Sequence, residues 1–384
     1  MKKAFLLLSF GVLAFAACQK IPADATLEGK KVAVEAFSGA ARKIFILNEG
    51  SMGANNATLD LLRMSDGLYI TAVFKKMNPS VQAGLGDVGN DIAVRGSEVW
   101  MVINNSGLVE VISAEDEKEI AAIEIPMPRG IAFDGDYAYV SSWAGAFYVG
   151  DYDGNGDWFI TDSANPKGRL YRIDLNTYKV DGYVEVGYQP EGGAVSGGKI
   201  YVANSGGISS QLPPLYSYDD TVSIIDAASF KVSGTVKVQI NLKNVYADSK
   251  GNVYVTTLGN YYDIHSGLYR IDPQGKVSKV ADYVSVSAPL GDTVYCMGTD
   301  TEYDWGATSH TYKGFTVNGG AKADWNLSVS ATALYSLCAV DAETFLVGDA
   351  DDYFNPGSVA CYNKGSRIWS ANAGVCPGHF AIWK

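Results

Sequence analysis

The sequence predicts an all-β protein built from many short strands. Apolar residues make up 47% and aromatic residues 12% of the 384 residues, which is enough to form a sizeable core. Charged residues make up only 19%, whereas Gly (42) and Tyr (24) are abundant. Aromatic residues favour strands and glycines favour tight turns. The composition therefore favours strands and turns over long amphipathic helices.

The first 17 residues are predicted to be a lipoprotein signal peptide. Lys2 and Lys3 precede an apolar run that ends in Ala16-Ala17-Cys18. This run is too short to cross a bilayer as a helix, and small residues before a cysteine resemble a bacterial lipobox. We predict lipidation of Cys18, which anchors a chain without spanning the membrane. The alternative is an ordinary secretory signal with an incidental cysteine. Residues 18–42, polar and without strong periodicity, are predicted to form a lipid-anchored tether.

A repeated strand pattern begins at Lys43 and continues to the end of the chain. One strand of each repeat has an aromatic residue or Leu at its centre, as in Val99-Trp100-Met101-Val102 and Ala138-Tyr139-Val140. Another strand and a Gly/Asp turn usually precede it, and alternating strands follow it. Seven copies of a four-strand unit predict a seven-bladed β-propeller over residues 43–384.

The two ends of the repeat region are incomplete, and each supplies what the other lacks. Residues 44–47 resemble the second strand of a blade with no innermost strand before it. Residues 378–383 resemble an innermost strand with no blade after it. Together they complete one blade and leave no strand edge unpaired. The propeller is therefore predicted to close by pairing of its N- and C-terminal strands.

Loop lengths predict which face of the propeller binds a ligand. Apart from the first repeat, length variation lies between the second and third strands, whose connections all emerge on one face. These loops carry rings, amides and carboxylates, which suit a large neutral or cationic ligand with flat faces. The alternative for any single ring is packing of one loop on another. The predicted ligand-binding residues are Asn48, Glu49, Asn55, Trp143, Phe147, Tyr148, Tyr216, Tyr218, Tyr261, Tyr262, Tyr303, Trp305 and Tyr353.

One loop has the spacing of calcium ligands. The oxygen-bearing side chains are Asp151, Asp153, Asn155, Asp157 and Asp162. With Gly156 at the sixth position, the spacing matches an EF-hand calcium loop. It departs from that motif because an Asp replaces the usual Glu at the last position and no helices flank it. We predict a structural calcium ion here, with a metal-free Asp/Gly turn as the alternative.

Charge and motifs argue against several other functions. The formal net charge of −12 disfavours nucleic acids and anionic membranes as partners. Metalloprotease, phosphate-loop and nucleophile-elbow motifs are missing from the sequence, so we assign no catalytic residues and expect no enzymatic activity. Four cysteines permit three disulfide pairings, and their spacing favours none. They are Cys296, Cys338, Cys361 and Cys376.

Five segments resemble the YncE-like propeller lipoproteins of Bacteroidetes, which are related to the YVTN propellers. They are residues 47–59 (LNEG through NNATL), 85–92 (LGDVGNDI), 186–191 (VGYQPE), 201–207 (YVANSGG) and 377–380 (PGHF). The resemblance covers nearly all of residues 43–384. It implies a lipoprotein of the outer membrane, exposed at the cell surface. It also implies binding of cobalamin or another corrinoid and its delivery to a TonB-dependent outer-membrane transporter.

We therefore predict a corrinoid-binding surface lipoprotein whose ligand lies on the loop-rich face. One alternative is a glycan-binding surface lipoprotein, in which the same rings stack on sugars. Another is a protein-interaction scaffold of the cell envelope. Stacking rings and acidic loops suit all three functions, so the sequence does not decide among them.

Overall fold

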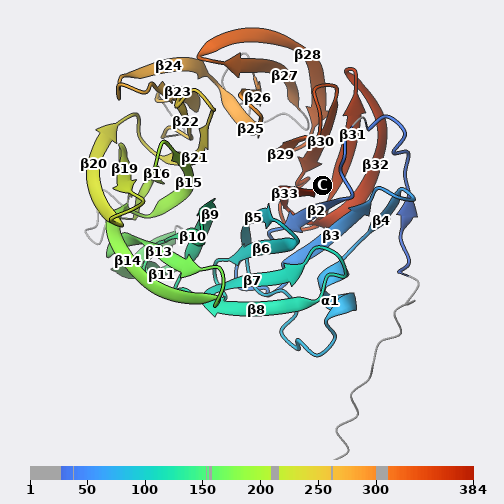
Figure 1. Ribbon diagram of the computed structural model, residues 1–384, viewed down its shortest axis with the longest axis horizontal. Coiled ribbons are helices and arrows are strands. Elements are labelled where there is room, and N and C mark those ends of the chain that lie inside the picture. The colour runs from blue at the N-terminus through green and yellow to red at the C-terminus, as the bar shows by residue number, and fades with distance from the viewer. Residues whose placement is uncertain are drawn as a thin grey trace, which may run out of the picture.

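The computed structural model describes residues 27–37, 39–152, 154, 158–208, 216–260, 263–299 and 310–384. Seven small antiparallel sheets surround a central axis (Figure 1), which confirms the predicted seven-bladed β-propeller. We number the blades along the chain, starting with the blade that contains both ends of the propeller. In the described part of the chain, no helix is long and apolar enough to cross a membrane.

Blades two to seven each consist of four antiparallel strands, ordered here from the axis outward. Blade two contains β5 (Gly89–Arg95), β6 (Glu98–Ile103), β7 (Leu108–Ser113) and β8 (Glu119–Glu124). Blade three contains β9 (Pro128–Asp134), β10 (Tyr137–Ser142), β13 (Lys167–Asp174) and β14 (Lys179–Tyr188). Blade four contains β15 (Pro190–Ser196), β16 (Lys199–Asn204), β19 (Thr221–Asp226) and β20 (Lys231–Lys237).

The remaining blades repeat this plan. Blade five contains β21 (Leu242–Ala247), β22 (Val253–Thr257), β23 (Gly267–Ile271) and β24 (Val277–Asp282). Blade six contains β25 (Val284–Leu290), β26 (Thr293–Gly298), β27 (His310–Asn318) and β28 (Ala321–Ala331). Blade seven contains β29 (Leu334–Ala339), β30 (Thr344–Asp349), β31 (Pro356–Asn363) and β32 (Ser366–Val375).

Blade one joins the two ends of the propeller, as the sequence predicts. From the axis outward it contains β33 (Pro377–Trp383), β2 (Lys43–Asn48), β3 (Thr58–Arg63), β4 (Leu68–Ile70) and β1 (Lys30–Lys31). The pairing of β2 with β33 runs from Lys43 opposite Trp383 to Leu47 opposite His379. A short helix, α1 (Val73–Met77), follows β4 at the periphery of the ring (Figure 1).

Part of the segment that the sequence predicts to be a tether is folded in the structure. Lys30 and Lys31 pair with β4, and Val32, Val34 and Phe37 pack against the apolar cluster between blades one and seven. The alternation of Val32 and Val34 gives this segment an apolar side that is stabilised by burial. The folded region therefore begins upstream of Lys43, and residues 27–37 add to blade one.

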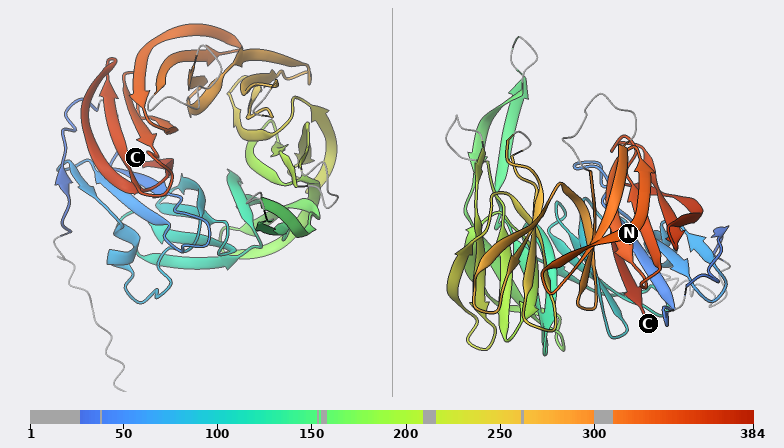
Figure 2. Two further views of the ribbon diagram at one scale, coloured as in Figure 1. Left: turned by 180° about the vertical axis from the view of Figure 1, so that it is seen from behind. Right: turned by 90° about the horizontal axis from the view of Figure 1, so that it is seen from above.

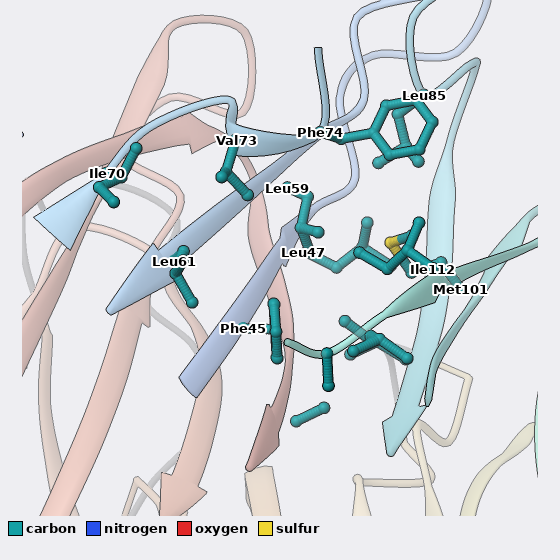
Figure 3. Close-up of a cluster of buried hydrophobic side chains, with 14 of the residues drawn as sticks. Phe45, Leu47, Leu59, Leu61, Ile70, Val73, Phe74, Leu85, Met101 and Ile112 are labelled. Carbon is teal, nitrogen blue, oxygen red and sulfur yellow. The ribbon is translucent and has the colours of Figure 1, made fainter. Parts of the chain in front are cut away.

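The core lies between neighbouring blades in a series of apolar clusters. In the cluster between blades one and two, Phe45 and Leu59 face Met101 and Ile112 (Figure 3). Helix α1 adds Phe74, which is also buried. Alternate residues of each strand point to opposite sides of its sheet, so both sides of every blade must be apolar. This requirement explains the high apolar content of the repeats.

Glu110 of β7 is a buried carboxyl group with an expected pH effect. Its Oε1 has no hydrogen-bond partner within the described residues. Burial, followed by the charge of Glu119, raises the pKa of Glu110 to about 8. Between about pH 4.5 and pH 8, Glu110 is therefore protonated in the folded protein and ionised in the unfolded chain. Its free energy of unfolding falls as the pH rises from about 4.5 to about 8.

Replacing this carboxyl group with an amide should remove that pH dependence. We expect Glu110→Gln to raise the melting temperature more at pH 8.5 than at pH 5.0. The stabilisation should reach about 3 kcal/mol at pH 7, since each pKa unit corresponds to about 1.4 kcal/mol. Glu124→Gln on exposed β8 is the control. Equal melting-temperature shifts at the two pH values for Glu110→Gln would contradict the assignment.

Candidate ligand site at the loop face

The connections between second and third strands all lie on one face of the propeller, which we call the loop face. Two of them contain additional hairpins. The hairpin of β11 (Phe147–Tyr152) and β12 (Trp158–Ala164) extends well beyond the blades (Figure 2). A smaller hairpin pairs β17 (Gly206–Ile208) with β18 (Tyr216–Tyr218). The extra chain length predicted for this face is thus present in blades three and four.

The seven innermost strands begin at the loop face and surround the mouth of an axial channel. The second residue of each strand occupies an equivalent position around this mouth. These residues are Gly378, Asn90, Arg129, Glu191, Lys243, Ser285 and Tyr335. The mouth forms a cavity of about 440 Å³. A second cavity of about 390 Å³ continues from it along the axis, where small apolar residues such as Ala93, Ala288 and Ala339 line it.

Glu49 is the centre of one hydrogen-bonded group at the mouth. It follows β2 directly, and its Oε1 lies 3.1 Å from Nε2 of His379. The hydroxyl of Tyr335 donates to its Oε2 at 2.6 Å. Burial alone raises the pKa of Glu49, but His379, Lys243 and Tyr335 outweigh burial and lower it. Glu49 is therefore held ionised, with both oxygens engaged.

Arg129 and Glu191 form a second group on the opposite side of the mouth. Nη2 and Nε of Arg129 donate to Oε2 of Glu191 at 2.8 and 3.0 Å, and Nη1 donates to Asn90. The indole Nε1 of Trp143 donates to Oε1 of Glu191 at 3.2 Å. The guanidinium also lies over the Trp143 ring, 4.4 Å from its centroid. The ion pair, the indole hydrogen bond and the cation–π contact fix the Trp143 ring at the rim.

A hydrogen-bonded turn of blade seven presents two aromatic rings on the loop face. Oδ1 of Asp352 accepts hydrogen bonds from the backbone N–H groups of Phe354 and Asn355 at 2.9 and 2.8 Å. Tyr353 is 48% exposed and Phe354 is 79% exposed. The Tyr353 ring also makes an edge contact with Tyr335, 5.9 Å between centroids. The turn therefore contacts Tyr335, whose hydroxyl donates to Glu49.

The structure brings some of the predicted ligand residues together and separates others. Glu49 and Trp143 line the mouth, and Tyr353 lies beside it. Asn48 is fully buried and its Nδ2 donates to Oγ1 of Thr58 at 3.0 Å, so it supports the loop and does not face a ligand. Asn55 lines a separate cavity, where its Nδ2 donates to the carbonyl of Ala83 at 3.1 Å.

The other predicted ligand residues lie in the hairpins or outside the described residues. Phe147 and Tyr148 belong to β11, and Tyr216 and Tyr218 belong to β18. Four more are outside the described residues: Tyr261, Tyr262, Tyr303 and Trp305. Their part in ligand binding stays a prediction.

Sequence reasoning missed most of the polar residues at the mouth. Arg129, Glu191, Lys243, Tyr335 and His379 lie near the starts of innermost strands, whereas the predicted ligand residues come from the connections between second and third strands. Aligning the starts of the innermost strands would have revealed Arg129, Glu191, Lys243 and Tyr335, because each of these residues follows a Pro or Leu. That signal is visible only once the repeats are superimposed.

The predicted calcium loop is partly a strand. Asp151 pairs opposite Phe159, and Asp162 lies in β12 opposite Val149. The first and last predicted ligands therefore belong to the paired strands of a hairpin, unlike the ends of an EF-hand loop. Asp153, Asn155 and Asp157 lie outside the described residues. Within the residues that are described, no group of three His, Cys, Asp or Glu side chains is arranged to hold a metal. Calcium binding stays a prediction.

The four cysteines downstream of Cys18 are buried free thiols. Burial raises the pKa of Cys296, Cys338 and Cys361 to about 12, and it raises that of Cys376 to about 11. Thiols with such a high pKa are unreactive near neutral pH, since the thiolate is the nucleophile. Because all four thiols are free, the structure contains none of the three disulfide pairings that the sequence allows.

Comparison with known proteins shows the class of fold. No protein-family model matches the chain, and no curated protein matches it. A Kuenenia stuttgartiensis hydrazine synthase structure is similar, with a TM-score of 0.55 and 13% identity over 76% of this chain and 88% of that chain. The computationally designed Ika8 protein has a TM-score of 0.50 and 11% identity over 93% and 98%. The RRP9 WD40 repeats have a TM-score of 0.50 and 8% identity over 75% and 81%.

These similarities show a β-propeller and nothing finer, because fold alone does not define function. The propeller fold is consistent with a protein-interaction scaffold. Any more specific function has to be argued from the site on the loop face.

Proposed function

We propose that the protein is a lipid-anchored binding protein of the outer membrane that captures a corrinoid on its loop face. The bound corrinoid is then delivered to a TonB-dependent outer-membrane transporter. The observation that supports the binding proposal is the mouth of the axial channel, which has Trp143 and Tyr353 at its rim and encloses a cavity of about 440 Å³. The lipid anchor at Cys18, the membrane location and the transporter are supported by the sequence resemblance.

The shape of the site suits a wide and flat ligand. A corrin is a broad plate with amide groups around its edge, much larger than the cavity of about 440 Å³ at the mouth. The plate would cover the mouth, and a single substituent would enter the cavity. Exposed aromatic rings can support the plate, and polar side chains can bond to its amides.

Rigidity of the site favours tight binding. Ordering flexible loops on binding costs free energy that would otherwise contribute to affinity. The Arg129–Glu191 ion pair holds Trp143, and the Asp352 turn holds Tyr353 and Phe354 before any ligand arrives. The site therefore needs little reorganisation.

A protein partner is the second candidate for the same face. The adjacent rings of Tyr353 and Phe354 are 48% and 79% exposed, and contiguous exposed apolar groups rimmed by polar residues mark interaction surfaces. A glycan ligand, stacked on the same rings, is the third. We propose no catalytic role for any of these residues.

Co-elution with a coloured vitamin tests the proposal. The chain without its predicted signal and without Cys18 (residues 19–384) is mixed with cyanocobalamin and passed over a sizing column, and absorbance of the corrin is followed. We expect the colour to travel with the protein. Tyr353→Ala and Trp143→Ala should each weaken binding about tenfold, as expected for aromatic anchors.

Tyr183→Ala is the matched control, because this ring is 50% exposed on β14 at the outer edge of blade three. It should leave binding unchanged. Elution of all the colour as free vitamin at micromolar protein would refute corrinoid binding, and glycan arrays would then test the third candidate.

A further inference from the structure

Lys243 differs from the other charged residues at the mouth. Glu49 is paired with His379, and Arg129 is paired with Glu191. Asp91 accepts hydrogen bonds from the backbone N–H groups of Ile92 and Ile131. Lys243 is exposed and lines both cavities. Across the described part of the chain, its ammonium group forms no hydrogen bond and no ion pair within 4.0 Å.

The residues that line the two cavities also supply free hydrogen-bond donors. Ser285 occupies the equivalent position in the adjacent blade six, and its exposed hydroxyl forms no hydrogen bond to any described residue. The Oδ1 of Asn90 accepts from Arg129, which leaves its Nδ2 donors available. The oxygens of Glu49 and Glu191, by contrast, already accept bonds from neighbouring side chains. The mouth therefore offers donors to an incoming group.

The position of Lys243 limits where an anion can lie. Glu49 is close enough for the charge of Lys243 to lower its pKa, so an anion on that side is repelled. Glu191 in the adjacent blade four is neutralised by Arg129. Among the described residues, blade six contributes no carboxylate to the lining of either cavity. In a protein with a net charge of −12, an unpaired cation at the axis attracts negative groups to the mouth.

We propose that Lys243 and Ser285 form an anion-binding subsite, which receives a phosphodiester or carboxylate group of the ligand. The inference rests on the proposed function and specifies which part of the ligand enters the channel. Cobalamin carries a phosphodiester in its nucleotide tail, whereas cobinamide lacks this tail. The tail would then enter the mouth, and the corrin plate would rest on the rim formed by Trp143 and Tyr353.

Comparison of the two corrinoids tests the subsite. Affinities of the wild-type protein and Lys243→Met are measured by calorimetry with cyanocobalamin and with dicyanocobinamide. We expect Lys243→Met to weaken cyanocobalamin binding about tenfold, the loss typical of a hydrogen bond to a charged group. It should leave dicyanocobinamide binding unchanged. Lys250→Met is the control, because Lys250 lies in the turn at the other end of β21. It should change neither affinity.

Each outcome separates this inference from the proposed function. If the wild-type protein binds both corrinoids and Lys243→Met weakens both equally or neither, the subsite is overturned and corrinoid binding stands. If the wild-type protein binds neither corrinoid, the proposed function fails, and inorganic phosphate becomes the probe. Phosphate should then raise the melting temperature of the wild-type protein but not that of Lys243→Met. Equal shifts in the two proteins would overturn the subsite.

Discussion

Deletion of Phe380–Lys384 is expected to abolish cooperative unfolding of the whole propeller. These residues form most of β33, which pairs with β2 along its length. β33 also packs beside the innermost strands β5 and β29 of the two neighbouring blades. Without it, blade one loses its innermost strand and β2 exposes an unpaired edge, which can pair with other molecules. We expect a broad melting transition and aggregation on a sizing column.

A second deletion provides the control for closure. A chain that begins at residue 32 lacks β1, which adds only a short pairing at the outer edge of blade one. It should melt as one cooperative unit, slightly below the temperature of the longer chain. A C-terminal truncation that melts as sharply as the intact protein, at a similar temperature, would contradict the closure.

Arg129→Met is expected to destabilise the protein and to weaken ligand binding. The side chains of Arg129 and Glu191 are only 16% and 13% exposed. Removing one partner of such a pair leaves the other charge buried, which costs about 3 kcal/mol. Trp143 also loses the cation that lies on its ring. Denaturant unfolding and corrinoid titration would measure the two effects.

The double variant Arg129→Met with Glu191→Met separates charge from packing. Both charges are then absent, so most of the lost stability should return. Ligand affinity should stay low, because the Nε1 of Trp143 has lost its acceptor as well. A double variant as unstable as Arg129→Met alone would show that the ion pair is not the source of the loss.

The fold could be predicted because its signals are local and repeated. Each second strand carries a buried apolar run, with Phe45, Trp100 or Tyr254 at its centre, and the turns between strands are marked by Gly and Asp. Closure of the propeller could be predicted because each end of the repeat region has a strand that lacks a partner within its own repeat. The packing of Val32 and Phe37 was missed, because a single alternating segment resembles a polar linker until the sheet that it contacts is known.

The site could be predicted only in part, because its residues come from distant strands. Loop lengths identified the correct face for the extra hairpins, and Glu49, Trp143 and Tyr353 were found there. Glu49 bonds to Tyr335 and His379, each more than 280 positions away in the sequence. No local sequence motif indicates that these residues meet. Burial of Asn48 likewise depends on distant chain, since a Cβ at Gly374 would lie 2.8 Å from its Cγ.

Hydrogen exchange with and without cyanocobalamin tests the central claim most directly, because it locates the ligand on the molecule. Backbone amides that bind or order against a ligand exchange more slowly. At saturating ligand we expect slower exchange in residues 49–57 and 350–355 of the loop face, and no change in residues 248–252 at the opposite face. Unchanged exchange in both loop-face segments, or protection confined to residues 248–252, would contradict a ligand site at the mouth of the axial channel.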